Sequence, residues 1–210
     1  MLIHDCEQGT DKWNKLRCDI PTASEFSNLV TAQGRESDGL DDYALVLAAG
    51  KYAGKPVDGF GGNRYTQRGK EMEPLADADY ELRNQVLVQK VGFVTNNLMQ
   101  YGCSPDGLVG HDGSVEYKCK IAKEHLKACW YYDRTGQVPS EYYAQPQGVM
   151  FVTGSKWCDL VFYHPHRPEQ YAQVLDLIRG TIDIPAGQIV IEALVLEISE
   201  TGLKQLGVEW

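Results

Sequence analysis

Apolar and polar residues alternate in the middle of the chain and recur at helical spacing on either side of it. Alternation and short apolar runs predict strands over residues 86–94, 98–103, 113–119 and 156–163. Apolar residues three and four positions apart predict helices over residues 22–30, 41–53, 64–83, 121–132 and 140–153. This order of helices and strands indicates an α/β domain with a mixed central β-sheet flanked by helices.

Local signals refine these elements. Thr22 and Glu25 form a capping-box pattern, which makes Thr22 the predicted N-cap of the first helix. Pro74 lies inside the predicted helix 64–83 and either kinks it or divides it. Residues 33–40 and 56–62 are rich in glycine and polar residues and are predicted to be loops. Residues 182–198 fit a strand or a helix equally well.

Size and composition indicate one globular domain over residues 1–210. No apolar run reaches the length of a membrane span, and the N-terminus lacks the pattern of a signal peptide, so we expect a cytoplasmic protein without membrane contact. The six cysteines include no Cys-x-x-Cys pair, and free thiols are expected. A zinc site from Cys103, His111, Cys119 and His125 is conceivable, but the spacing matches no familiar zinc pattern.

The net charge of −9 argues against a protein that coats DNA passively, because such binding depends on neutralising phosphates. The total charge does not fix the local field, however. Basic residues gather in three groups: Lys12, Lys15 and Arg17; Arg64, Arg68 and Lys70; Lys118, Lys120, Lys123 and Lys127. An acidic exterior with a basic channel is therefore compatible with the composition.

Candidate chemistry lies between Ser104 and Lys118. On a strand over 113–119, Glu116 and Lys118 share one face, and Asp106 precedes a turn that can fold it back beside them. Two carboxylates can hold a divalent cation, and a neighbouring ammonium can orient or deprotonate a water molecule. These three residues alone fit a metal-dependent phosphodiester hydrolase and a plain surface ion pair equally well.

Other segments favour the first interpretation, because together they resemble the phage lambda exonuclease family, also described as YqaJ-like viral recombinases, of the Asp…Glu-x-Lys nuclease superfamily. Four blocks carry the resemblance: Glu7–Arg17 with Thr22–Glu25, Arg68–Glu73, Cys103–Leu108 with Glu116–Cys119, and Tyr143–Gln147 with Met150. They stand in the family's order and span roughly residues 6–165. The resemblance implies a restriction-endonuclease-like nuclease core.

The resemblance also implies an activity. Members of this family degrade one strand of linear duplex DNA from its 5′ end, release mononucleotides and leave a 3′ overhang. They use Mg²⁺, form a trimeric ring around DNA and work with a single-strand annealing protein in phage recombination. By this resemblance we expect a phage- or prophage-encoded exonuclease that acts in the bacterial host and uses two Mg²⁺ ions, with Mn²⁺ as an alternative.

Within that resemblance, individual residues take roles. Asp106, Glu116 and the Tyr117 carbonyl are the expected metal ligands, because hard cations accept carboxylate and backbone oxygens. Glu73 corresponds to the family's helix-borne acid and would help to bind the second ion. A lysine near a metal in a desolvated pocket has a lowered pKa, so Lys118 is the expected base next to the attacking water, and it could also form a plain ion pair with Glu116. Gln145, rather than Gln147, is the expected glutamine of the active site.

Two further groups would contact DNA. Arg17, Thr22 and Ser24 lie at a predicted helix N-terminus, which suits a 5′-phosphate, although Thr22 could simply cap its helix. Lys120, Lys123 and Lys127 follow the catalytic strand at helical spacing and fit either a DNA-tracking face or a solvated one. Some family members have an arginine near position 124, where this chain has Glu124. Residues 130–132, Trp-Tyr-Tyr, are expected to be packing residues rather than platforms on which bases stack.

Two alternatives remain at this point. The chain could be a RecB-like or structure-selective nuclease of the same superfamily, which would nick circular DNA. It could also be a non-catalytic DNA-binding protein that keeps the fold, although the complete set of Asp106, Glu116 and Lys118 argues against that interpretation.

Overall fold

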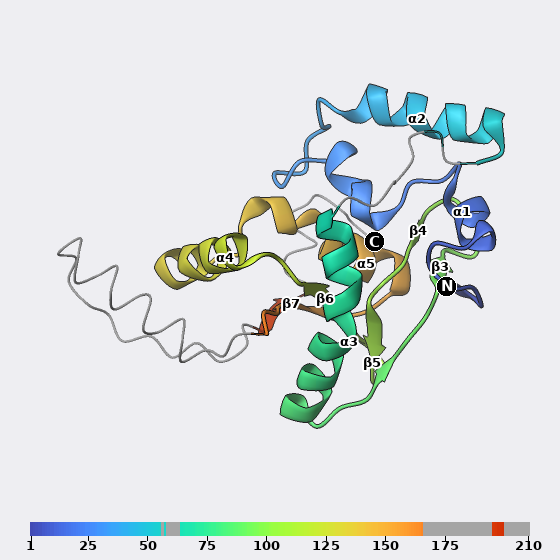
Figure 1. Cartoon of the computed structure of the whole chain (residues 1–210). Helices are drawn as coiled ribbons and strands as arrows, with labels where there is room; N and C mark the ends of the chain where they lie inside the picture. The colour runs from blue at the N-terminus through green and yellow to red at the C-terminus, as the bar shows by residue number, and fades with distance from the viewer. Residues whose placement is uncertain (56, 58–63, 166–194, 200–210) are drawn as a thin grey trace.

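The structure is a computed structural model that describes residues 1–55, 57, 64–165 and 195–199 (Figure 1). Its centre is a five-stranded sheet in the order β2-β5-β6-β7-β8. The strands are β2 (Val88–Gln89), β5 (Gly107–Val109), β6 (Gly113–Lys118), β7 (Trp157–Phe162) and β8 (Val195–Ser199). β6 and β7 are parallel and the other neighbours antiparallel, which confirms the predicted mixed sheet.

A second sheet was not predicted. It is antiparallel, with the order β1-β3-β4, and consists of β1 (Leu2–His4), β3 (Phe93–Thr95) and β4 (Gly102–Cys103). The single strand predicted over 86–94 is therefore wrong, because the chain leaves one sheet after Gln89 and enters the other at Phe93. Gly92 permits this passage, since a Cβ there would lie 1.7 Å from the Cys6 carbonyl oxygen. Of the predicted strand 98–103, only β4 forms.

Four of the predicted helices are confirmed with shifted ends: α2 (Leu40–Ala53), α3 (Arg64–Asn84), α4 (Ala122–Thr135) and α5 (Ala144–Thr153). A short helix, α1 (Asp11–Arg17), was not predicted. A 3₁₀ turn, η2 (Ser140–Tyr142), precedes α5. α3 continues through Pro74 as one helix. The predicted loop 56–62 lies outside the described residues except for Val57.

The first predicted helix is a 3₁₀ helix, η1 (Ala23–Asn28), and its capping box does not form. Thr22 precedes η1 but makes no side-chain cap. Its Oγ1 instead accepts a hydrogen bond from Arg17 (3.3 Å), and the Glu25 carboxylate accepts one from Asn28 (2.9 Å). The Thr22 hydroxyl therefore binds Arg17 instead of capping the N-terminus of η1.

Helices cover both faces of the central sheet. On one face, Ala76 and Tyr80 of α3 pack against Val115 and Tyr117 of β6. On the other face, Ala128 of α4 packs against Leu160 and Phe162 of β7. Because side chains alternate along a strand, Glu116 and Lys118 of β6 point away from α3, towards α5. In the described parts of the chain, no helix combines the length and apolar character that a bilayer crossing needs.

The close approach of α5 to η1 depends on Gly148. A Cβ at this position would lie 2.6 Å from Phe26 Cδ2 and 3.0 Å from the Ala23 Cβ, so the two helices would have to separate. We expect Gly148→Ala to lower the free energy of unfolding by about 1–3 kcal/mol, as overpacking usually does. Urea unfolding followed by circular dichroism measures the change.

Gly69 is the matched control for that substitution. It also lies inside a helix, but a Cβ there meets no atom within 4 Å. We expect Gly69→Ala to be neutral or to stabilise by roughly 0.5–1 kcal/mol, because alanine loses less backbone entropy than glycine. Equal stability of the two variants would contradict the role given to Gly148.

Candidate active site

The centre of the site is a hydrogen-bonded triangle of Glu116, Lys118 and Gln145. The Lys118 ammonium donates to Glu116 Oε2 (3.3 Å) and to Gln145 Oε1 (2.8 Å). The amide of Gln145, from α5, donates in turn to Glu116 Oε2 (2.6 Å). The structure therefore brings these three residues together. Gln147 lies elsewhere in the core, 2% exposed, and no partner for its amide is found among the described residues.

Glu116 is fully buried, and only one of its two oxygens is satisfied. Oε1 is buried and has no hydrogen-bond partner in the part of the chain that the structure describes. Burial, and next the charge of Asp106, raise the pKa of Glu116 to about 8. A buried carboxylate oxygen without a partner is costly, and a cation would relieve that cost. The residue therefore fits a metal ligand on its own geometry.

Asp106 folds back beside β6, as its position before a turn predicted. Its Oδ2 accepts a hydrogen bond of 2.6 Å from the Tyr117 backbone N–H. Burial raises the pKa of Asp106, and the nearby Lys118 ammonium opposes that effect. The N–H and C=O of one strand residue point to the same strand edge, so the Tyr117 carbonyl faces the side on which Asp106 lies.

The protein alone does not produce the lowered pKa that was expected for Lys118 beside a metal ion. Burial by itself lowers this pKa, but the charges of Glu116 and Asp106 outweigh burial, and the net shift is upward. Without a bound cation, Lys118 is therefore a firmly protonated ammonium that the carboxyl groups of Glu116 and Asp106 stabilise. It can act as a base only when another cation offsets the negative charge of these two groups.

Glu73 of α3 lies near Asp106 but contacts a lysine that the sequence did not single out. Lys90 Nζ is 3.5 Å from Glu73 Oε1 and 3.0 Å from Asp77 Oδ1, and it donates to the Asp106 carbonyl oxygen (2.9 Å). Asp77 also accepts a hydrogen bond from the Tyr117 hydroxyl (2.8 Å). The spacing of four residues between Glu73 and Asp77 on α3 could have revealed Asp77. Lys90 carries no comparable local signal.

The carboxylates do not form a complete metal cage. Among the described residues, no three His, Cys, Asp or Glu side chains converge closely enough to hold an ion. The six cysteines are free thiols, and the conceivable zinc site of Cys103, His111, Cys119 and His125 does not form. His125 lies instead beside Cys129 (Nε2–Sγ 3.7 Å) and next to the ring of His164.

A cavity of about 1160 Å³ joins the catalytic candidates to the phosphate candidates. Asp106 and Gln145 line it, and so do Arg17, Thr22 and Ser24. The Arg17 guanidinium lies 4.1 Å from the centre of the Trp13 ring and donates to Thr22 Oγ1, while Thr22 Oγ1 and Ser24 Oγ are 3.3 Å apart. The three predicted phosphate ligands therefore lie together, in the wall of the cavity that holds Asp106.

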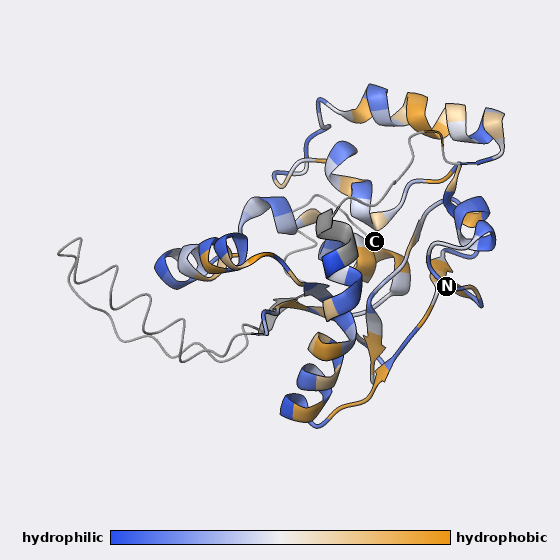
Figure 2. Ribbon diagram, in the orientation of Figure 1, coloured by the Kyte–Doolittle hydropathy of each residue, from blue (hydrophilic) through white to orange (hydrophobic). Residues whose placement is uncertain are grey.

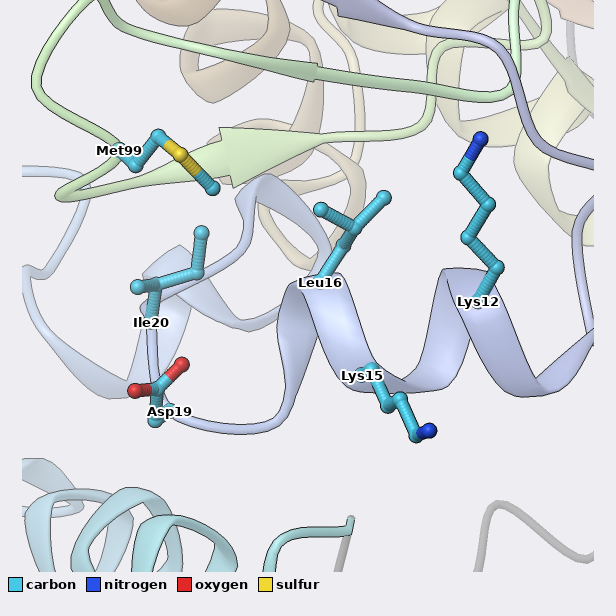
Figure 3. Close-up of a pocket in the computed structure, with 6 residues that line it drawn as sticks. All are labelled: Lys12, Lys15, Leu16, Asp19, Ile20 and Met99. Atoms are coloured by element: carbon cyan, nitrogen blue, oxygen red, sulfur yellow. The ribbon is translucent and has the colours of Figure 1, made fainter.

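A smaller pocket of about 550 Å³ contains none of the candidate catalytic residues. It lies along α1, where the side chains of Leu16, Ile20 and Met99 approach one another (Figure 3). Lys12, Lys15 and Asp19 complete its lining. The candidate residues that line either cavity all line the larger one.

The lysines after β6 separate into two environments. Lys120 is half-buried, with its ammonium 5.6 Å from the centre of the Tyr142 ring, whereas Lys123 and Lys127 are exposed on α4. The predicted core packing of Trp130 and Tyr131 is wrong, because these side chains are 43% and 39% exposed. Tyr132 does pack against the core beside Leu160 and Phe162.

Comparison with models of known protein families shows which family the chain belongs to. The model of the YqaJ-like viral recombinase domain matches residues 12–156, which is more than half of the chain. The chain belongs to this family. The matched range contains Asp106, Glu116, Lys118, Glu73 and Gln145, together with Arg17 and Thr22. No curated protein sequence matches the chain.

Solved structures agree with the family. The alkaline exonuclease LHK-Exo from Laribacter hongkongensis is 26% identical, with a TM-score of 0.68 over 94% of this chain and 90% of that chain. LHK-Exo in complex with dAMP is 25% identical, with a TM-score of 0.69 over 94% and 87%. A phage-related exonuclease from Haemophilus somnus 129PT shares the fold at 19% identity and a TM-score of 0.54, over 71% and 70%. The predicted fold class is therefore confirmed as a nuclease fold of the alkaline exonuclease type.

Proposed function

We propose that this family member is a metal-dependent exonuclease that degrades linear double-stranded DNA from the 5′ end, releases 5′-mononucleotides and leaves a 3′ overhang. One observation carries the proposal: Asp106 and Gln145 line the same cavity as Arg17, Thr22 and Ser24. A terminal phosphate held by the second group would place a strand end next to the first. Similarity to an alkaline exonuclease whose solved complex contains dAMP, a mononucleotide, supports this activity.

Asp106, Glu116 and the Tyr117 carbonyl would hold one Mg²⁺ or Mn²⁺ ion, with water completing the shell, and Glu73 would help to hold a second ion. The unpartnered Glu116 Oε1 and the all-oxygen donor set fit such hard cations. When bound, the metal would polarise the scissile phosphate and compensate the charges of the two carboxylates. Glu73 would have to give up its contact with Lys90 to take part.

Lys118 and Gln145 would handle the attacking water. Once the charges of Glu116 and Asp106 are compensated, burial becomes the dominant influence and lowers the pKa of Lys118. Lys118 could then accept the proton of a water that attacks the phosphorus atom. Gln145 contacts both Glu116 and Lys118, so it would fix the direction of the lysine during this transfer.

Linear duplex DNA labelled separately at each 5′ and 3′ terminus tests the proposal directly. With Mg²⁺, the 5′ label should appear first, in a mononucleotide, while the 3′-terminal label stays in a long strand. EDTA should stop the release. Nicking of closed circular DNA, or a 3′ label released first, would contradict the proposed polarity and favour another nuclease of the superfamily.

The proposal also covers assembly. A trimeric ring around DNA and a single-strand annealing protein as partner are expected from the family resemblance. Light scattering on the purified chain would measure the first, and co-purification with a phage annealing protein would measure the second. A monomer that digests long duplexes without dissociating would contradict the ring.

Arg17 should discriminate between phosphorylated and unphosphorylated ends. We expect Arg17→Ala to slow digestion of 5′-phosphorylated duplex by about 10–100-fold, because a charge-assisted contact to the terminal phosphate is lost. Digestion of 5′-hydroxyl ends should change little. The initial rate of label release on the two substrates measures this difference.

Arg35→Ala is the matched control, since Arg35 is exposed and does not line the cavity. Its rates on both substrates should equal those of the parent protein. An equal loss for Arg17→Ala on phosphorylated and hydroxyl ends would show that Arg17 does not bind the terminal phosphate.

A further inference from the structure

The exposed side of α4 carries a narrow row of basic and aromatic side chains. Lys123, Lys127, Trp130 and Arg134 are all exposed. At 3.6 residues per turn they fall within about 60° of one another around the helix axis, which places them in one line along α4. The buried residues Ala128 and Cys129 lie on the other side of the helix. We call these four residues the α4 row.

The α4 row has the chemistry of a nucleic-acid surface rather than that of a solvated charged face. Its three cations stand on a protein of net charge −9. The acidic residues of α4, Glu124 and Asp133, lie about 90° from the middle of the row around the axis, one on either side of it. The Arg134 guanidinium lies 4.5 Å from the centre of the Trp130 ring, and this cation–π contact restricts the orientation of a side chain that is 43% exposed.

The row also begins next to the chemistry. α4 starts four residues after Lys118, and the half-buried Lys120 lies between them. Figure 1 shows α4 on one side of β6 and α1, which carries Arg17, on the other. Figure 2 shows hydrophilic residues along much of α4. A strand end bound at Arg17 and a strand lying on α4 would therefore occupy opposite sides of the catalytic strand.

We propose that the α4 row binds single-stranded DNA, namely the strand that remains after its complement has been hydrolysed; this rests on the proposed exonuclease function. Lys123, Lys127 and Arg134 would contact phosphates, and Trp130 would stack on a base. A duplex offers no base face to such an indole along its length, whereas a single strand offers one at every nucleotide. The combination of cations with an exposed tryptophan thus selects single-stranded over double-stranded DNA.

The test is a binding measurement that needs no catalysis. A fluorescein-labelled oligothymidylate with a 5′-hydroxyl is titrated with the full chain in EDTA, and fluorescence anisotropy gives the dissociation constant. We expect Trp130→Ala to weaken binding by about tenfold or more, as loss of one stacked base does, and Trp130→Phe to retain most of the affinity. Lys127→Ala should reduce the dependence of log K on log salt by about 0.7, the value for one phosphate of a single strand.

Matched controls come from the same chain. Tyr52 on α2 is 96% exposed and lies outside the α4 row, and Lys156 is an exposed lysine that pairs with Asp112. Tyr52→Ala and Lys156→Ala should leave oligothymidylate binding unchanged. Binding of a blunt duplex that carries 5′-hydroxyl ends should change less than about twofold in Trp130→Ala, because its bases stay stacked inside the helix.

Three results would overturn the assignment. The first is an equal loss of oligothymidylate affinity in Trp130→Ala and Tyr52→Ala, and the second is an equal loss of affinity for single-stranded and duplex DNA in Trp130→Ala. The third is a change in oligomeric state for Lys127→Ala, which would mark the row as a subunit contact. The end-label assay separates this proposal from the proposed function. A parent protein that binds oligothymidylate through α4 but releases no label would refute the exonuclease and not the row.

Discussion

Replacing Lys118 by alanine is expected to abolish phosphodiester hydrolysis while the protein stays folded. Lys118 makes hydrogen bonds with both Glu116 and Gln145 and is the one ammonium in that triangle. Loss of a general base costs about 10²–10⁴ in rate, and the neighbouring Gln145 cannot accept a proton in its place. We therefore expect single-turnover cleavage to fall by about 10²–10⁴-fold.

Cation binding should survive this substitution, because Lys118→Ala removes a positive charge that competes with the metal for Glu116 and Asp106. Calorimetric titration with Mn²⁺ should show equal or tighter binding. Lys156→Ala, a change of an exposed lysine paired with Asp112, should leave both turnover and cation binding unchanged. Near-normal cleavage by Lys118→Ala would remove Lys118 from the reaction, whatever its effect on the metal.

The elements that could be predicted from the sequence are those with a strong local period. The strand around Val115 alternates apolar or aromatic side chains with ionisable ones, and α4 has a clearly amphipathic helical pattern. The break between β2 and β3 could not be predicted, because it follows from the approach of Gly92 to the Cys6 carbonyl, which lies far away in sequence. A local pattern cannot reveal a contact made by distant backbone.

The candidate site follows the same division. Asp106, Glu116 and Lys118 lie within thirteen consecutive residues, so a turn and one strand bring them together. Local pattern could not separate Gln145 from Gln147 and needed the family resemblance, because the start of α5 decides which of them meets Lys118. Lys90 reaches Asp106 only through the fold. The exposure of Trp130 could have been predicted, since on a helix it lies about 60° from Lys127 and about 160° from the buried Ala128 around the axis.

The metal-free protein should lose stability as the pH rises, and Glu116 should cause much of that loss. The pKa of Glu116 is about 8 in the folded protein, because of burial first and Asp106 second, against an ordinary value of 4.5. Between these values the folded protein keeps a proton that the unfolded chain has released. Proton linkage then lowers the free energy of unfolding as the pH rises through this window, and the loss levels off above about 8.

Glu116→Gln removes this titration and isolates its contribution. In EDTA, the variant should have a flatter dependence of unfolding free energy on pH, and above pH 8 it should exceed the parent by on the order of a few kcal/mol, since each pKa unit corresponds to about 1.4 kcal/mol. Some slope will remain, because burial also raises the pKa values of Asp106 and Glu73. Urea unfolding at a series of pH values measures both curves.

Mg²⁺ should restore the stability that the parent protein loses at alkaline pH, and it should have little effect on the stability of Glu116→Gln. A cation binds the ionised carboxylate, so it should stabilise the parent more at alkaline than at acidic pH. Glu116→Gln has no charge to offer at this position and should gain little stability at either pH. Glu36→Gln, at an exposed loop position, should behave as the parent does. A parent protein whose stability in EDTA is flat or rises between the two pKa values would show that Glu116 is not held protonated, and the buried cation site built on its unpartnered Oε1 would lose its physical basis.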